Sequence, residues 1–393
     1  MTGADPAVVP VTEARPVGRP RLRALVGAAG RSCFAVLVAV LLALVLIRLQ
    51  GFAPVPTMLA GLGYAVGDLD SAARTLAWGL PLLVAALGVA QGFRGGMFNI
   101  GAEGQVYLGA LAAAVVGAYL GPLFAGLHLV LCLVAAGLAG GLVAGGLGWL
   151  RAHWGVDEVL STLLSNYVLI LLCAYLANGP LRDPTRQSGS TRNVHDTAMF
   201  PVILPRTELT AALFLVVGLA GFAWWLSERS VAGYRWRMTG ASPGFAAAVG
   251  IDVARGRTAC MAVSGALCGL GGALLVMTSQ GRFWTEIGTG IGWDAVLLAL
   301  VGRARPVGVV VWAAGYCVMR ASARGVEQAT GIPAELSSVL IAVIIIAAAA
   351  RNGMFALVAD RVRRWGVLTG GRSTGPGRTG PGRTGPGLSG GRR

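Results

Sequence analysis

Long apolar runs, separated by short polar segments, recur along almost the whole chain. Runs of this kind predict membrane-spanning helices, because about 20 apolar residues are needed to cross a bilayer. The pattern therefore predicts an all-α, polytopic membrane protein with about ten transmembrane or re-entrant helices. The two short pieces before the last span are either two short crossings or one re-entrant hairpin. We expect spans at about residues 33–47, 72–91, 97–120, 122–149, 159–177, 207–227, 257–279, 293–302, 306–321 and 335–350.

The same pattern divides the chain into three parts. Residues 1–32 form a basic N-terminal tail, residues 33–350 form the transmembrane domain, and residues 351–393 form an Arg-, Gly- and Pro-rich tail. The C-terminal tail repeats Thr-Gly-Pro-Gly-Arg from Thr374 and again from Thr379. It has too few apolar residues to bury, so we expect it to be disordered.

Composition excludes several classes of protein. Charged residues make up 12% of the chain, about half of what a soluble globular protein carries. Hydrophobic residues make up 55%, and there are 60 glycines besides. A water-soluble enzyme, a disordered protein and a nucleic-acid-binding domain all need more polar surface than this sequence provides. We expect membrane lipid, and no nucleic acid, among the partners.

The net charge of +15 indicates the orientation. Five Arg against two acids give the N-terminal tail +3, and nine Arg against one acid give the C-terminal tail +8. Basic segments beside apolar spans are typical of the cytoplasmic side. An even number of crossings then places both termini in the cytoplasm, in a multi-pass protein of the bacterial cell membrane. The loop at 179–206 disagrees, because it carries four Arg yet would be external.

The residue types also limit the chemistry. All 32 basic residues are Arg, and a P-loop needs a Lys to reach the nucleotide phosphates. If ATP drives this protein, another polypeptide must therefore hydrolyse it. The three His are scattered, the six Cys lie in apolar stretches, and no Ser/His/Asp set is clustered. We expect no catalytic site, no cofactor and no metal.

The first informative segment is the glycine-rich run at 93–105, which enters an apolar span and brings Asn99, Glu103 and Gln105 to membrane depth. A carboxylate within a span is costly unless it faces a polar cavity or a partner. Broken helices of this kind line substrate paths in many transporters. Two interpretations stay open: Glu103 lines a path, or it pairs with an Arg or a helix end and supports the fold.

The second segment lies in the longest connection between spans, at 229–257. Ser242 is a good N-cap, Pro243 suits the first helical position, and Gly250 can end a helix. The sequence predicts a short helix of two turns here. It is either a simple interfacial helix or a small-faced helix that inserts into a groove of a partner protein.

Glycines also recur at four-residue spacing inside two spans. Gly137, Gly141 and Gly145 form one ridge, and Gly265 and Gly269 form another. Such ridges let helix backbones approach closely in lipid. They indicate either a static contact or a moving interface.

Together these segments resemble the permease subunits of ABC importers of the branched-chain amino acid, ribose and nucleoside superfamily. The sequence of residues 96–105 is most similar to the corresponding segment of simple-sugar and purine nucleoside permeases. Residues 240–251 match the cytoplasmic family element G-x-N-P-x-A-A-x-x-x-G-I, with Ser242 in place of Asn. Residues 158–167 and 292–303 are similar stretches, and the resemblance covers about residues 70–350.

The resemblance implies a permease without an ATPase site of its own. It implies three protein partners: an ATPase with two nucleotide-binding halves, a second related permease subunit and an extracytoplasmic solute-binding lipoprotein. The residues that it assigns to the substrate path are Phe98, Asn99, Glu103, Gln105 and Asn166. The residues that it assigns to the helix coupled to the ATPase are Gly240, Ser242, Pro243, Ala246, Ala247 and Gly250.

The sequence leaves the identity of the solute and the energy source open. A nucleoside, a ribose-like sugar and an autoinducer-type sugar all suit this scaffold, and homodimer and heterodimer both stay open. The competing class is an ion-gradient-driven secondary transporter of a small polar solute. Such a transporter needs a relay of intramembrane carboxylates or His, and beyond Glu103 and Asp294 the spans have almost none.

Overall fold

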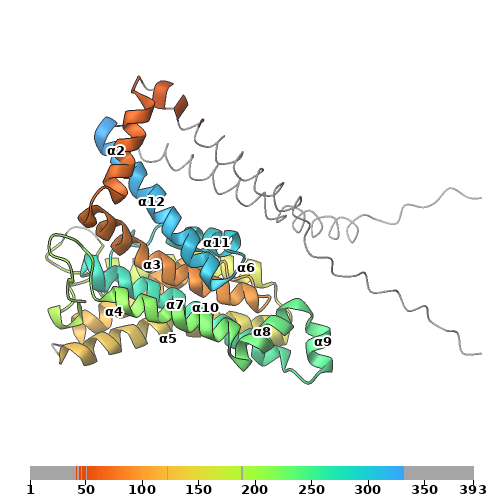
Figure 1. Ribbon diagram of the computed structural model, residues 1–393. Coiled ribbons are helices and arrows are strands. Elements are labelled where there is room, and N and C mark those ends of the chain that lie inside the picture. Colours follow the sequence, from red (N-terminus) through yellow and green to blue (C-terminus); the bar gives the residue numbers. More distant parts are fainter. Residues whose placement is uncertain are drawn as a thin grey trace, which may run out of the picture. The chain divides into compact units, whose positions relative to one another are not determined.

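The computed structural model describes residues 51–331 except 122, 187 and 188, and parts of a helix at 41–49. Within these residues the chain is helical, without strands and with two isolated β-bridges. The helices are α2 (Pro54–Val66), α3 (Leu69–Arg94), α4 (Ala102–Tyr119), α5 (Ala125–Trp154), α6 (Glu158–Asn178), the 3-10 helix η1 (Asp196–Ala198), α7 (Ala212–Glu228), α8 (Val231–Ala241), α9 (Pro243–Ala248), α10 (Val253–Leu275), the π-helix η2 (Val276–Gln280), α11 (Ile291–Val301) and α12 (Pro306–Thr330) (Figure 1).

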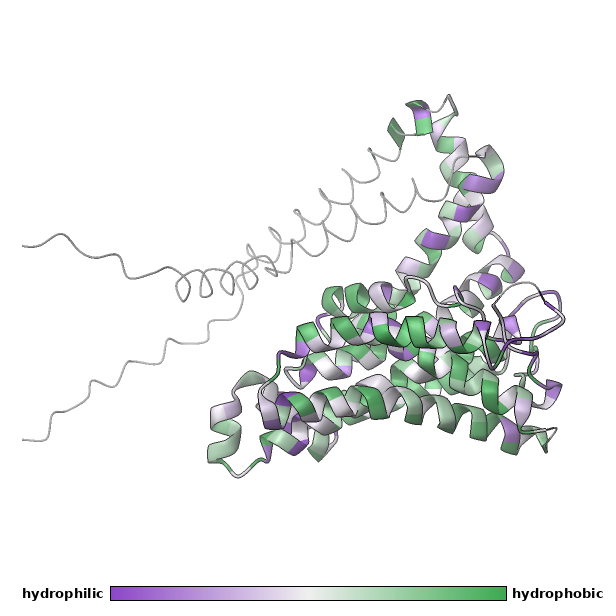
Figure 2. Cartoon of the chain, turned by 180° about the vertical axis from the view of Figure 1, so that it is seen from behind, coloured by the Kyte–Doolittle hydropathy of each residue, from purple (hydrophilic) through white to green (hydrophobic). Residues whose placement is uncertain are grey.

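The helices have the lengths and composition of a membrane protein. Five are long and apolar enough to cross a bilayer, namely α3, α5, α6, α10 with η2, and α12. Helices α7 and α8 add a sixth span if they count as one span bent by 62°. Hydrophobic residues cover most of these helices, and hydrophilic residues gather at helix ends and loops (Figure 2). The all-α, polytopic fold is confirmed, while the expected span at 335–350, most of that at 33–47 and both tails lie outside the described residues.

Several helices differ from the expected spans, and three of these differences have a clear cause. Helix α2 was not expected, because its 13 residues are too few for a span. Helix α4 begins at Ala102 instead of residue 97, because residues 95–101 form a turn and a loop. Helix α12 continues to Thr330 instead of residue 321, because Arg320 and Arg324 end the apolar run but not the helix.

The break expected between residues 302 and 306 is confirmed. Helix α11 ends at Val301 and α12 begins at Pro306, the preferred residue for a first helical position. Arg303 and Ala304 have positive φ angles of 56° and 52°, which few non-glycine residues adopt. The chain therefore turns sharply between two separate helices.

Helix α10 lies at the centre and contacts α3, α4 and α5. Its glycines make these contacts possible on three sides. A Cβ at Gly265 would overlap the carbonyl of Gly140 in α5, and one at Gly272 would overlap the carbonyl of Val106 in α4. A Cβ at Gly271 would lie 2.9 Å from the carbonyl oxygen of Pro81 in α3. The helices therefore meet backbone to backbone.

The glycine ridge of α5 differs by one residue from the expected one. Its tightest contact is made by Gly140, which lies against Gly265 and Gly269 of α10. Gly141 and Gly145 contact Ala262 and its neighbours, and Gly137 has only an ordinary contact with Leu270. Helix periodicity brings both neighbouring positions to the interface, and only the structure shows which one is closest.

The long connection between α6 and α7 folds back onto the bundle. Thr191 donates its backbone N–H to Phe283 O at 3.0 Å, and Val194 donates to Gly281 O at 2.8 Å. Phe283 is fully buried and packs edge-on against Tyr107 of α4, with ring centroids 6.2 Å apart. This connection therefore covers the end of η2.

Candidate functional site

Residues 95–101 join α3 to α4 and hold two buried amide side chains together. Asn99 Nδ2 donates to Gln105 Oε1 at 2.8 Å, and Gln105 Nε2 donates back to Asn99 Oδ1 at 2.9 Å. Asn99 Oδ1 also accepts from the Gly101 N–H, and Asn99 Nδ2 donates to Ser264 Oγ of α10 at 2.9 Å. Both amides are fully buried, so these bonds compensate for their lost hydration.

Helix α6 holds the beginning of α4. Asn166 Oδ1 accepts from the Gly104 N–H at 2.8 Å, and Asn166 Nδ2 donates to Ile100 O at 2.7 Å. Thr162, one turn earlier, accepts from the Ile100 N–H at 3.3 Å. One face of α6 thus supplies a partner for the Gly104 N–H, which the first turn of α4 leaves unpaired, and for the backbone of Ile100 just before the helix.

Glu103 lies where the N-termini of two helices meet. It belongs to the first turn of α4, and its Oε1 accepts from the Gly290 N–H, at the N-cap of α11, at 3.0 Å. A carboxylate is favourable beside the N–H groups of a helix N-terminus. Its other oxygen, Oε2, is buried without a hydrogen-bond partner among the described residues. Glu103 therefore has a helix end as partner and one oxygen left over.

Phe98 is the remaining residue of the expected path. Its side chain is half-buried, and its ring lies 5.0 Å from that of Phe93. The backbone carbonyl of Phe98 accepts from the Thr162 hydroxyl at 3.4 Å. The structure thus brings all five expected residues to the loop at 95–101 and the start of α4.

The short helix in the 229–257 connection is confirmed. Ser242 is the N-cap of α9 and accepts from the Phe245 N–H, and Pro243 occupies the first helical position. Gly250 has a φ of 80° just after the helix, a conformation that favours glycine. Ala246 is buried, whereas Phe245 and Val249 are each 54% exposed. Helix α9 therefore presents an apolar surface that none of the described residues covers.

The two sequence segments touch each other through their glycines. Gly96, with a φ of 72°, lies so close to Gly240 at the end of α8 that a Cβ on either would come within 2.7 Å of the other's backbone. A Cβ at Gly240 would also lie 2.6 Å from the carbonyl oxygen of Arg94. We name this contact of Gly240 with residues 94–96 the glycine joint. It links α8, and through it α9, to the loop that carries Asn99.

Charged side chains surround the glycine joint. Arg94 Nη2 lies 2.6 Å from Glu228 Oε1, at the end of α7. Arg237 of α8 lies 3.4 Å from Glu228 Oε2 and also donates to the carbonyl of Ser227. One carboxylate thus pairs with two guanidinium groups and fixes α3, α7 and α8 to one another.

The sequence did not predict several partners of the expected residues. Ser264, Thr162 and Gly290 each bond to the 99–105 segment from a distant part of the chain. Tyr107 and Thr289 form another such bond, with 3.0 Å between their oxygens. The one local signal is that Thr162 and Asn166 are polar residues four apart in an apolar helix, and so share a face.

A bundle of apolar helices with buried polar side chains at the start of α4 is typical of a multi-pass membrane protein. The chain belongs to the family described as branched-chain amino acid transport system / permease component, whose model matches residues 71–349. It is a permease subunit of an ABC importer, and so a transporter component instead of an enzyme. This assignment also separates it from ion-gradient-driven secondary transporters.

Several characterised relatives are permeases of the same kind. The chain is 30% identical over 292 residues to the guanosine ABC transporter permease protein NupP of Bacillus subtilis (strain 168), covering 71% of this chain and 81% of that protein. It is 31% identical over 277 residues to the glucose ABC transporter permease protein of Haloferax volcanii, covering 68% and 73%. It is 26% identical over 292 residues to the nucleoside ABC transporter permease protein NupB of Lactococcus lactis subsp. cremoris, covering 72% and 79%. The comparison with solved structures found no match.

Proposed function

We propose that this chain forms part of the translocation path for a nucleoside, with a simple sugar as the second candidate. The observation that supports a nucleoside as the solute is the match to a guanosine permease over 81% of that protein's length. The match to a glucose permease over 73% of its length keeps the sugar as an alternative. The chemistry of the site suits both, because ribose and hexose hydroxyls need hydrogen-bond acceptors.

The proposed path runs past Phe98, Asn99, Glu103, Gln105 and Asn166. Glu103 Oε2 is the acceptor that we assign to the solute once the path opens, because no described residue gives this buried oxygen a hydrogen bond. The amides of Asn99, Gln105 and Asn166 are engaged with the backbone or with each other. In this conformation they support the loop, and Glu103 is the residue that we assign to the solute.

The proposed energy source is a separate ATPase with two nucleotide-binding halves that docks on α9. The exposed Phe245 and Val249 support this docking, and the glycine joint supports transmission from α9 to the 95–101 loop. The chain would then supply no ATPase site. A second related permease subunit completes the path, and a solute-binding lipoprotein delivers the solute from outside. The α9 side and both termini are then cytoplasmic.

Uptake measurements test the solute. A strain that lacks this chain should lose uptake of radiolabelled guanosine and regain it with the intact gene. Uptake of radiolabelled ribose and glucose should be unchanged by the deletion. Loss of sugar uptake with normal nucleoside uptake would reverse the order of the two candidates, and normal uptake of all three would contradict the proposal.

Substitutions in α9 test the docking. Replacing Ala247, which is exposed on α9, by Glu should abolish copurification of the ATPase and nucleoside uptake, while the protein stays inserted. Asn193→Glu, which adds the same charge at an exposed position of the 179–206 loop, is the matched control and should retain both. Copurification that survives Ala247→Glu would show that the ATPase binds elsewhere.

A further inference from the structure

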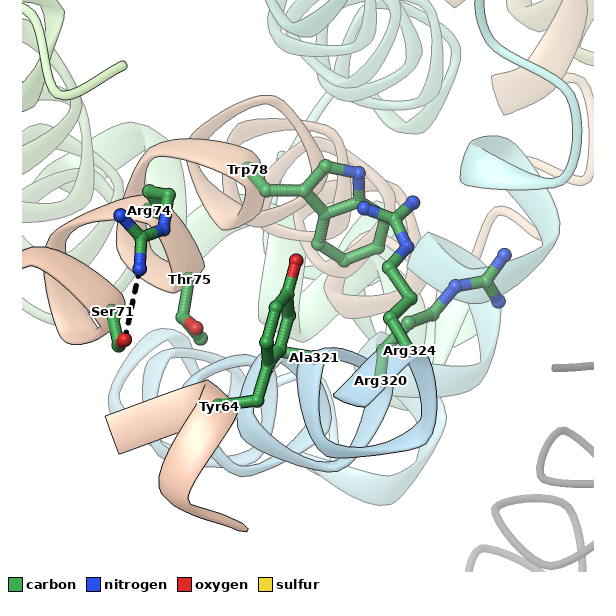
Figure 3. Close-up of a pocket in the computed structure, with 8 residues that line it drawn as sticks. All are labelled: Tyr64, Ser71, Arg74, Thr75, Trp78, Arg320, Ala321 and Arg324. Atoms are coloured by element: carbon green, nitrogen blue, oxygen red, sulfur yellow. Dashed lines mark hydrogen bonds between the residues drawn. The ribbon is translucent and has the colours of Figure 1, made fainter. Parts of the chain in front are cut away.

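A pocket at the other end of α3 from Arg94 gathers three arginines and two aromatic residues. Figure 3 shows the pocket between α2, α3 and α12. Its lining residues are Tyr64 of α2, Ser71, Arg74, Thr75 and Trp78 of α3, and Arg320, Ala321 and Arg324 of α12. Arg320 and Arg324 lie four residues apart and so share one face of α12.

The arginines carry more positive charge than the neighbouring side chains balance. Among the residues that the structure describes, only Arg320 of the three has a carboxylate within 4.0 Å, that of Asp294 at 3.6 Å. Arg74 donates to the Ser71 hydroxyl at 2.9 Å, and the charge of Asp68 acts on it from further away. Arg324 lies over the Trp78 ring, 5.1 Å from its centroid. The described part of the chain therefore offers the guanidinium groups of Arg74 and Arg324 no paired anion.

The side chains around these charges are already arranged for a ligand. Trp78 holds both Arg320 and Arg324 by cation–π contacts, at 5.6 and 5.1 Å, and so fixes their positions. The Tyr64 hydroxyl accepts a hydrogen bond from Gln328 at 3.4 Å and can donate its own proton, whereas the Ser71 hydroxyl bonds to Arg74 and to Asp68. Guanidinium groups and a hydroxyl donor that line one pocket suit the oxygens of a phosphate group (Figure 3).

The position of the pocket makes this charge unusual. Helices α3 and α12 both have the length and composition of membrane spans, and the three arginines gather where the apolar runs of the two helices end. With the orientation proposed above, the pocket also lies on the external half, which normally carries few arginines. This second point rests on the proposed function, whereas the unpaired charge does not.

We propose that this pocket binds a phosphate group, supplied either by the headgroup of an anionic phospholipid or by a soluble phosphate. The phosphate oxygens accept from Arg74 and Arg324, while Trp78 keeps the guanidinium of Arg324 in place. The ligand joins α2, α3 and α12 at a site distinct from the 95–105 segment.

The test compares binding by the full chain in nanodiscs. Phosphatidylcholine discs, discs that also contain phosphatidylglycerol, and phosphatidylcholine discs with added inorganic phosphate distinguish the two sources. Thermal unfolding and native mass spectrometry are the measurements. The lipid source predicts a higher Tm and retained phosphatidylglycerol, and the soluble source predicts a higher Tm with inorganic phosphate.

Variants connect the binding to the pocket. The double variant Arg74→Gln, Arg324→Gln should weaken phosphate or phosphatidylglycerol binding at least about tenfold, since each charge-assisted hydrogen bond is worth about that factor. Arg192→Gln is the matched control, because Arg192 also lies over an aromatic ring, that of Tyr119, at 5.7 Å. If the double variant fails to fold, Arg74→Gln alone still tests the site.

Each outcome decides the proposal. Binding that is lost in the Arg74 and Arg324 variants and kept in Arg192→Gln supports it, whichever source binds. No binding of either phosphate source, or equal binding by the double variant, overturns it. None of these measurements needs transport, so a failure of the proposed function would leave the result interpretable.

Discussion

The arginines at the two ends of α3 differ in whether a carboxylate pairs with them. At one end, Arg94 and Arg237 share the carboxylate of Glu228, and Gly240 packs against the backbone of residues 94–96. At the other end, Arg74 and Arg324 face a pocket without a carboxylate within 4.0 Å among the described residues. At the first end a carboxylate pairs with both guanidinium groups, whereas at the second end the described residues offer Arg74 and Arg324 none.

This difference distinguishes arginines that stabilise the fold from arginines that we propose bind a ligand. Removing one partner of a paired, half-buried charge leaves the other unpaired and costs stability. Removing a charge that has no partner costs little and relieves repulsion. Stability and ligand binding should therefore respond oppositely at the two ends, and the predictions below test this from the largest expected effect to the smallest.

The largest effect should come from filling the glycine joint. Gly240→Leu cannot fit against the backbone of residues 94–96 without displacing it, and overpacking of this kind costs about 1–3 kcal/mol. We expect nucleoside uptake to be abolished while the protein remains in the membrane. Gly221→Leu in α7 is the control, because a Cβ at Gly221 meets nothing within 4 Å. Equal uptake by the two variants would show that the joint transmits nothing.

The next effect concerns Glu103. Glu103→Gln keeps an acceptor for the Gly290 N–H, whereas Glu103→Leu leaves this group unpaired at a cost of about 1–3 kcal/mol. If Glu103 also binds solute, Leu should abolish uptake and Gln should retain part of it, at equal abundance in the membrane. Glu286→Leu makes the same change at an exposed position and should transport normally. Normal uptake by Glu103→Leu would remove the residue from the path.

A moderate effect should follow from removing the shared carboxylate. Glu228→Gln leaves Arg94, whose side chain is 13% exposed, without its counter-charge. We expect a loss of about 1–2 kcal/mol, which lowers the Tm in detergent by roughly 2–5 °C. Asp252→Asn is the control, because its partner Arg255 is 90% exposed and Asn also caps helices well. An unchanged Tm for Glu228→Gln would abolish the contrast between the two ends.

The smallest effect belongs to the other end of α3. Arg74→Gln, measured without phosphate, should leave the Tm within about 1 °C of the parent, because exposed charges without a partner contribute little. Its hydrogen bond to Ser71 is local and is replaced by water. A fall as large as that of Glu228→Gln would mean that Arg74 has a structural role instead of a binding role.

Local features could be predicted from the sequence and long-range contacts could not. The limits of α9 follow from Ser242, Pro243 and Gly250, because capping depends on neighbours in the chain. The position of the polar segment at 95–105 follows from its contrast with the apolar run around it. The glycine joint joins residues 144 positions apart, from 96 to 240, and no spacing rule predicts such a contact.

The two interpretations of Glu103 show the same limit. The sequence allowed either a path residue or a residue paired with a helix end, and the structure supplies the helix end at Gly290. That partner lies in a segment without a recognisable pattern, so it could not be named beforehand. The buried Oε2, without a hydrogen-bond partner among the described residues, leaves the path interpretation as a prediction beside the structural one.

The glycines of α10 also bear on how the chain is assembled during synthesis. Gly265, Gly269, Gly271 and Gly272 each cost about 1 kcal/mol of helix stability relative to Ala, so α10 is a poor helix by itself. Its neighbours α3, α4 and α5 all precede it in the chain and leave the ribosome first. Helix α10, which has a low intrinsic helix stability, is therefore synthesised after the three helices that pack around it. A nascent chain halted before residue 253 would expose the surfaces that α10 covers.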